Sequence, residues 1–87
     1  MVSEDITLKS KEGLHARPAA EIAKNAAKYN CDVKLGVQGN EYNAKSVLNI
    51  MAAGIKDNTK IKLICNGTDE KEALAELLNI FKINSLL

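Results

Sequence analysis

The stretch Gly13-Leu14-His15-Ala16-Arg17-Pro18-Ala19-Ala20 decides how the chain is organised, because it holds the only histidine, arginine and proline of the 87 residues. Proline has a φ close to the helical value and lacks an N–H group, so Pro18 suits the first turn of a helix. The alanine-rich segment after it favours helix, and Gly13 gives the chain freedom to turn before it. We therefore expect a helix over about residues 16–28, with His15 at or just before its N-terminus.

A helix start gives His15 a setting that favours anions, because free backbone N–H groups and the positive end of the helix dipole lie there. The backbone of Ala16 and Arg17 would supply such N–H donors. The Arg17 guanidinium adds a planar, permanently charged donor group that matches phosphate oxygens, and imidazole is a neutral nucleophile near pH 7. These features predict a phosphoryl group carried on His15. Position alone also fits a simple capping histidine.

Length and composition indicate one soluble domain over residues 1–87, large enough for a core without metals or disulfides. The net charge of +1 and the three aromatic residues argue against nucleic acid as a partner. The sequence has no apolar run of about 20 residues and no signal peptide. We expect a cytoplasmic protein that does not insert into membranes.

Cys31 and Cys65 are far apart in the sequence, and neither has a second cysteine or a histidine close to it. This spacing argues against a zinc site and against a redox pair of the CxxC type. Both fall in register with apolar strand positions, so we predict reduced cysteines in the core. No metal site and no cofactor are expected.

Alternation of polar and apolar residues predicts four strands, at residues 5–9, 31–37, 41–43 and 60–65. Turn residues at 38–40 join the second and third strands into a hairpin.

Helical spacing predicts three helices, at residues 16–28, at 47–53, and after Asp69. Asp69 and Glu72 have the spacing of a capping box, and the apolar stripe of the last helix comprises Ala73, Leu74, Leu77, Leu78 and Phe81. The order β-α-β-β-α-β-α predicts an α+β fold, a two-layer sandwich with an antiparallel sheet whose strand order the pattern leaves open.

The helix at 47–53 is unusual, because only Asn49 interrupts an apolar surface that extends almost all the way round it. Ser46 fits its N-cap and Gly54 its C-terminal end. So short a helix cannot bury every side in a small domain, and exposed apolar surface commonly marks a docking site. The alternative is that neighbouring elements cover it.

The octet at residues 13–20 resembles the active-centre signature of the HPr family, the histidine-containing phosphocarriers of the bacterial sugar phosphotransferase system. Similarities to the family extend over nearly the whole chain. The resemblance implies an open-faced sandwich, with a four-stranded antiparallel sheet and all three helices on one face. It also implies that His15 is phosphorylated on Nδ1 and that Arg17 stabilises the phosphoryl group.

The same resemblance implies the partners. The phosphoryl donor would be phosphorylated Enzyme I, charged by phosphoenolpyruvate, and the acceptors would be the IIA domains of sugar permeases. The protein would be a monomeric, stoichiometric carrier rather than an enzyme. The surface that docks these partners would comprise Ala20, Lys24, Val47, Leu48 and Met51.

Ser46 corresponds to the regulatory serine of the family, which an ATP-dependent HPr kinase/phosphorylase modifies, with a catabolite-control transcription regulator as a further partner. Serine is also common as a plain N-cap. Two departures from the family pattern bear on transfer rates and partner preference: Glu12 places a carboxylate close to the site, and Asn49 is bulkier than the small residue of some relatives.

Two alternative functions remain, one implied by the family resemblance and one by the element order. One is a regulatory HPr-like protein that acts mainly through phosphorylated Ser46; His15 argues against it, since such relatives lack the active histidine. The other is a small-ligand sensor of ferredoxin-like topology, which would have no reason to hold the octet.

Overall fold

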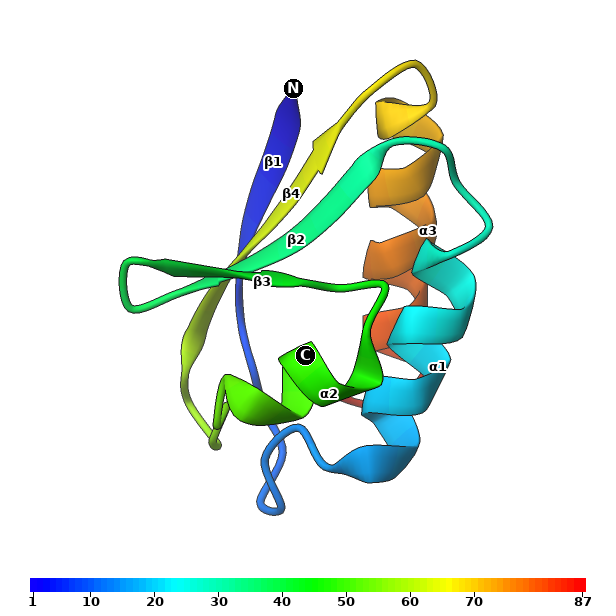
Figure 1. Cartoon of the computed structure of the whole chain (residues 1–87). Coiled ribbons are helices and arrows are strands. Elements are labelled where there is room, and N and C mark those ends of the chain that lie inside the picture. The colour runs from blue at the N-terminus through cyan, green and yellow to red at the C-terminus, as the bar shows by residue number, and fades with distance from the viewer.

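The computed structural model describes all 87 residues and contains four strands and three helices. In chain order they are β1 (Val2–Thr7), α1 (Ala16–Ala26), β2 (Asp32–Val37), β3 (Asn40–Asn43), α2 (Val47–Ala52), β4 (Lys60–Asn66) and α3 (Glu70–Ile83). The sheet has the order β1-β4-β2-β3, with every neighbouring pair antiparallel. The helices lie on one side of it, which leaves the other face open (Figure 1). The predicted α+β class and element order are confirmed.

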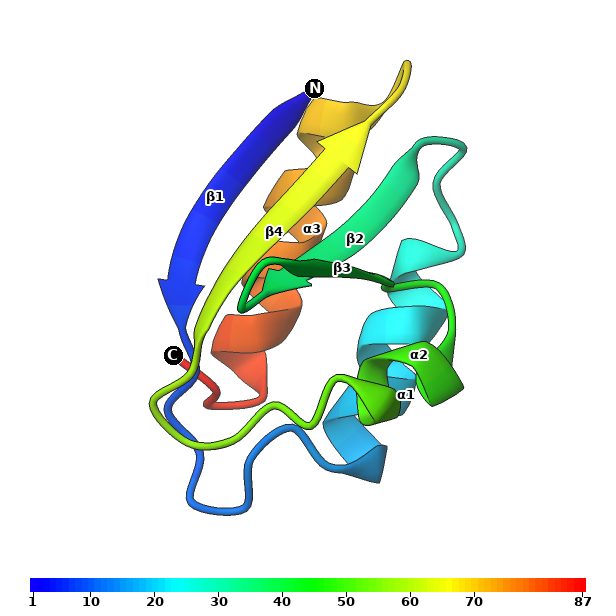
Figure 2. The same ribbon diagram turned by 60° about the vertical axis from the view of Figure 1, so that its left-hand side comes forward.

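The core lies between the helices and the inner face of the sheet. The alternation predicted for the two central strands is confirmed, because Val33 and Leu35 of β2 face inward opposite Cys65 and Leu63 of β4. Small side chains let α1 approach the sheet closely; its buried residues are Pro18, Ala19, Ile22, Ala23 and Ala26. Helix α3 packs beside α1 (Figure 2).

Both cysteines are buried and unpaired, as predicted. Burial raises the pKa of the Cys31 thiol to about 11 and raises that of Cys65 as well. Because the thiolate is the reactive form, these side chains are inert packing groups at neutral pH.

Strand β1 begins and ends earlier than the sequence predicted. It runs antiparallel to β4 from Val2, opposite Cys65, to Thr7, opposite Lys60. Leu8 lies beyond the strand and is fully buried; its N–H donates to the Thr59 carbonyl (2.9 Å) and its carbonyl accepts from Asn58 (2.8 Å). Pairing with β4, rather than local alternation, sets the length of this strand. The other elements differ from prediction by one or two residues at their ends.

The predicted capping box at the start of α3 is wrong. Asp69 is the N-cap residue, but its side chain makes no cap hydrogen bond. Its carboxylate instead accepts from the backbone N–H of Asn30 (2.8 Å) and of Cys31 (2.9 Å), and these bonds lower the pKa of the Asp69 carboxyl. The carboxylate thus ties the start of β2 to the start of α3.

The apolar stripe of α3 is also shifted from the prediction. Ala73, Leu77 and Phe81 are buried as expected, while Leu74 and Leu78 are only half-buried and Ile80 is buried in addition. None of the three helices combines the length and apolarity that crossing a membrane requires.

Candidate functional site

The loop between β1 and α1 carries the site and is anchored at several points. The N–H of Lys9 donates to the Leu86 carbonyl (2.7 Å), that of Ser10 to Asp57 Oδ1 (3.0 Å) and that of Leu14 to the Ile55 carbonyl (2.9 Å). These bonds hold the loop between the segment before β4 and the C-terminal tail. The tail and this loop lie close together at one end of the molecule (Figure 2).

Gly13 is required by this anchoring. Its φ is +70°, a conformation that side chains disfavour, and a Cβ placed there would lie 2.6 Å from the backbone oxygen of Ile55. Its N–H closes a turn by donating to the Ser10 carbonyl (2.9 Å). The glycine therefore fixes a close approach of two backbones immediately before His15.

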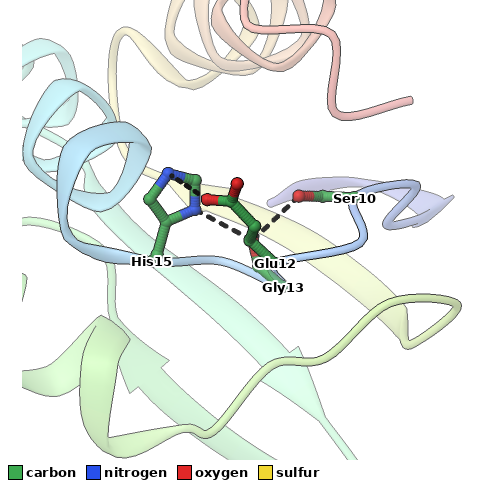
Figure 3. Close-up of polar contacts among 4 residues, drawn as sticks. All are labelled: Ser10, Glu12, Gly13 and His15. Carbon is green, nitrogen blue, oxygen red and sulfur yellow. Dashed lines mark hydrogen bonds and ion pairs between the residues drawn. The ribbon is translucent and has the colours of Figure 1, made fainter.

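His15 is the N-cap residue of α1, as the sequence predicted, but its imidazole does not cap the helix. Its backbone carbonyl accepts the first helical hydrogen bond, from Ala19 (3.1 Å). The ring is 43% exposed. Its Nδ1 lies 3.3 Å from the Gly13 carbonyl oxygen and its Nε2 lies 3.5 Å from Oε2 of Glu12 (Figure 3). The simple capping interpretation does not describe this side chain.

The first turn of α1 offers unoccupied donors next to the ring. The backbone N–H groups of Ala16 and Arg17 have no hydrogen-bond acceptor in the structure. The Arg17 side chain is exposed and makes no ion pair or hydrogen bond. Pro18, which has no N–H, occupies the third helical position and is buried. The start of α1 therefore has two free N–H groups and an unpaired guanidinium.

His15 and Arg17 both line a polar cleft of about 510 Å³. Its walls are the site loop, the first turn of α1 and the C-terminal segment; the lining residues are Ser10, Lys11, Glu12, His15, Arg17, Pro18 and 83–86. Lys11 and Arg17 supply two positive charges, and Glu12 supplies the single carboxylate of the lining. No pattern in the sequence indicates that the C-terminal tail borders this cleft. The apolar pair Leu86 and Leu87 is the one feature that could have suggested a docked tail, and Leu86 is buried.

Helix α2 is exposed in the way the sequence predicted. Leu48 is 82% exposed, Met51 42% and Val47 37%, whereas Ile50 is buried. The alternative that neighbouring elements cover this helix is wrong. Helix α2 lies beside α1 (Figures 1 and 2), and Ala20 and Lys24 of α1 are exposed.

Ser46 caps α2, also as predicted. Its Oγ accepts a hydrogen bond from the backbone N–H of Asn49 (3.2 Å), and the side-chain Nδ2 of Asn49 lies 3.5 Å from the same oxygen. Asn49 therefore folds over the serine hydroxyl. Gly54 follows the helix with a φ of +61°.

Comparison with known proteins agrees with this architecture. The family model described as "PTS HPr component phosphorylation site" matches residues 2–82. The phosphocarrier protein HPr of Mycoplasma genitalium is 38% identical, over 92% of this chain and 92% of the relative. The HPr-like protein Crh of Bacillus subtilis is 39% identical, over 88% of this chain and 91% of the relative.

A solved structure of a histidine-containing phosphocarrier protein from a mycoplasma superposes with a TM-score of 0.97. It is 30% identical in sequence, and the match covers 99% of this chain and 98% of that one. The family model thus covers nearly all of the chain, the curated relatives exceed 30% identity over most of their length, and the fold coincides. The chain belongs to the HPr family of phosphocarrier proteins of the phosphotransferase system.

Proposed function

We propose that the protein accepts a phosphoryl group on Nδ1 of His15 from phosphorylated Enzyme I and passes it to IIA domains of sugar permeases. It would do so in the cytoplasm, as a monomeric, stoichiometric carrier. The observation that supports this most is a half-exposed, non-capping imidazole that shares one cleft with the unpaired Arg17 side chain, at a helix start where the N–H groups of Ala16 and Arg17 are free. Phosphoryl transfer needs mainly positioning and charge stabilisation, which these groups supply.

Transfer to Nδ1 requires one movement of the ring. The Gly13 carbonyl oxygen lies 3.3 Å from Nδ1, within reach of a hydrogen bond, and occupies the place a phosphorus atom must take. The half-exposed ring would turn away from Gly13 as the donor binds. The phosphoryl oxygens would then receive hydrogen bonds from Arg17 and the start of α1.

The direct test is intact-mass spectrometry after incubation with Enzyme I and phosphoenolpyruvate. We expect the mass of one added phosphoryl group, which mild acid removes because phosphohistidine is acid-labile. An unchanged mass under conditions that phosphorylate another HPr would overturn the proposal.

Arg17→Ala should slow phosphoryl transfer by about 10- to 100-fold, because a hydrogen bond to a charged group contributes about 1.5–3 kcal/mol. Its melting temperature should change little, since the exposed side chain has no partner to lose. Rapid-quench kinetics with phosphorylated Enzyme I measure the rate. Lys71→Ala, which removes a positive charge at the far end of α3, is the control; equal rates in both variants would contradict the clamping role of Arg17.

Leu48→Glu should weaken binding to Enzyme I and to IIA domains by about tenfold or more, as expected for an apolar residue in a docking surface. The fold should persist because the side chain is exposed, and Met51→Glu should act in the same direction. Isothermal titration calorimetry measures the affinities. Asn79→Glu adds the same charge on an exposed part of α3 and should bind normally. Unfolding of Leu48→Glu would instead place the residue in the core.

A regulatory role of Ser46 is the second candidate function, and the similarity to Crh, the catabolite repression HPr of Bacillus subtilis, supports it. HPr kinase/phosphorylase would act on Ser46, and a catabolite-control transcription regulator would read the product. If Ser46 but not His15 became labelled, the protein would be a regulatory HPr-like protein acting through this serine.

Ser46→Asp should lower the rate of His15 phosphorylation by Enzyme I without lowering thermal stability. Negative charge is favourable at a helix start, but here it lies next to the exposed Leu48 and Met51 and would hinder docking. Ser46→Ala separates the two roles: it removes the cap on Asn49 and should cost about 1 kcal/mol of stability while leaving docking intact. An unchanged rate in Ser46→Asp, together with no labelling by an HPr kinase and ATP, would reduce Ser46 to a helix cap.

A further inference from the structure

Glu12 carries the single carboxylate that lines the cleft around His15. Its Oε2 lies 3.5 Å from His15 Nε2, its side chain is 75% exposed, and it has no other hydrogen-bond or ion-pair partner. The turn that presents it is held by the Gly13 N–H, which donates to Ser10, and by the Ser10 N–H, which donates to Asp57. Glu12 is therefore placed against the ring by a fixed backbone and is free to follow Nε2 when the ring turns.

The two ring nitrogens face acceptors of different strength. Nδ1 faces the neutral Gly13 carbonyl, whose oxygen already accepts a hydrogen bond from Ser10 Oγ (3.1 Å). Nε2 faces a charged carboxylate, and charged acceptors bind a proton donor more strongly than neutral ones. The Gly13 carbonyl favours the ring proton on Nδ1, whereas the Glu12 carboxylate favours it on Nε2. Once the ring turns away from Gly13, as transfer requires, only Glu12 still faces a ring nitrogen, which leaves the proton on Nε2 and the lone pair on Nδ1.

We propose that Glu12 is a positioning residue that draws the ring proton of His15 toward Nε2 and balances the positive charge that the ring gains during phosphorylation. This inference rests on the proposed function. The Nδ1 lone pair forms the N–P bond, while the bond between phosphorus and the donor breaks and its electrons remain with the donor. Nε2 keeps its proton, so the product is a phosphoimidazolium cation beside the Glu12 carboxylate. On transfer to an acceptor, the electron pair of the N–P bond returns to Nδ1 and the ring becomes neutral again.

The size of the effect follows from the exposure of both partners. An exposed ion pair of this kind corresponds to about a two- to fivefold change in an equilibrium constant. Repulsion between the Glu12 carboxylate and the incoming phosphoryl group would act in the opposite direction. Neutralising Glu12 lowers the phosphorylated fraction if charge balance in the ring dominates. It raises the phosphorylated fraction if repulsion of the phosphoryl group dominates.

The test compares Glu12→Gln with Glu41→Gln in the full chain. Glu41 also lies 3.5 Å from a cationic partner, Lys34, but on the β2–β3 hairpin away from the site, so this variant controls for net charge. One measurement is the ratio of phosphorylated to free protein at equilibrium with Enzyme I, phosphoenolpyruvate and pyruvate. The other is the ¹⁵N NMR spectrum of the imidazole in unphosphorylated protein, where His15 gives the only signals.

We expect Glu12→Gln to lower the phosphorylated-to-free ratio about two- to fivefold and to move ring proton from Nε2 toward Nδ1. Glu12→Asp should restore part of both effects, and Glu41→Gln should match the wild type. An unchanged proton distribution in Glu12→Gln, or an equal or higher phosphorylated fraction, would overturn the role of Glu12 while leaving His15 as the acceptor. Absence of phosphorylation in the wild type would overturn the proposed function, whereas the proton distribution in the unphosphorylated protein would still report on Glu12.

Discussion

His15→Ala is expected to fold like the wild type and to accept no phosphoryl group from Enzyme I. The ring makes no cap hydrogen bond and is half-exposed, so little packing is lost with it. The chain has no second imidazole to take over the chemistry. Acid-labile labelling, followed by mass spectrometry, should therefore fall to the background level.

Two controls make this result specific. The melting temperature and the circular dichroism spectrum of His15→Ala should match those of the wild type. Ser46→Ala should remain labelled on His15, which excludes the serine hydroxyl as the source of the signal. Acid-labile phosphate retained in His15→Ala would contradict the assignment of the site.

Gly13→Ala is expected to destabilise the protein by about 2–3 kcal/mol and to slow transfer to His15. Placing a non-glycine residue at a φ of +70° costs about 1–2 kcal/mol. The new Cβ would also lie 2.6 Å from the Ile55 carbonyl oxygen, so the hydrogen bond from Leu14 to that oxygen would weaken. Urea denaturation measures the stability. The rate of His15 phosphorylation by Enzyme I reports whether the site loop has moved.

Gly54→Ala is the matched control for this prediction. Gly54 has a similar φ of +61°, but a Cβ there would meet nothing within 4 Å. The Gly54→Ala variant should therefore lose only about 1–2 kcal/mol of stability, the cost of a side chain at this φ. Its His15 should be phosphorylated at the normal rate. If Gly13→Ala were no less stable than Gly54→Ala, the close approach to Ile55 would not be what fixes the site loop.

The features that the sequence predicted well depend on local pattern. The central strands alternate strictly because one face of each is buried, which places Val33 and Leu63 inward in the sequence and in the structure. Pro18 marks the first turn of α1, and His15 precedes it at the N-cap. The exposure of Leu48 follows from the shortness of α2, which cannot bury all of its apolar sides.

The features that the sequence predicted poorly depend on partners distant in the chain. The Asp69 carboxylate binds the N–H groups of Asn30 and Cys31 instead of its own helix, because folding brings these donors next to it. Leu86 docks the C-terminal tail through a hydrogen bond to Lys9, which closes one side of the cleft. The presence of Glu12 near the site was evident from its position, but its contact with Nε2 depends on the turn that Gly13 forms.

The measurement that tests the central claim most directly is ¹⁵N–³¹P NMR of the protein after phosphorylation by Enzyme I and phosphoenolpyruvate. With a single histidine in the chain, the imidazole signals need no assignment by mutagenesis. The account predicts coupling of ³¹P to Nδ1 of His15, lost after mild acid treatment. Coupling to Nε2, or phosphate found only on a hydroxyl group such as that of Ser46, would contradict it.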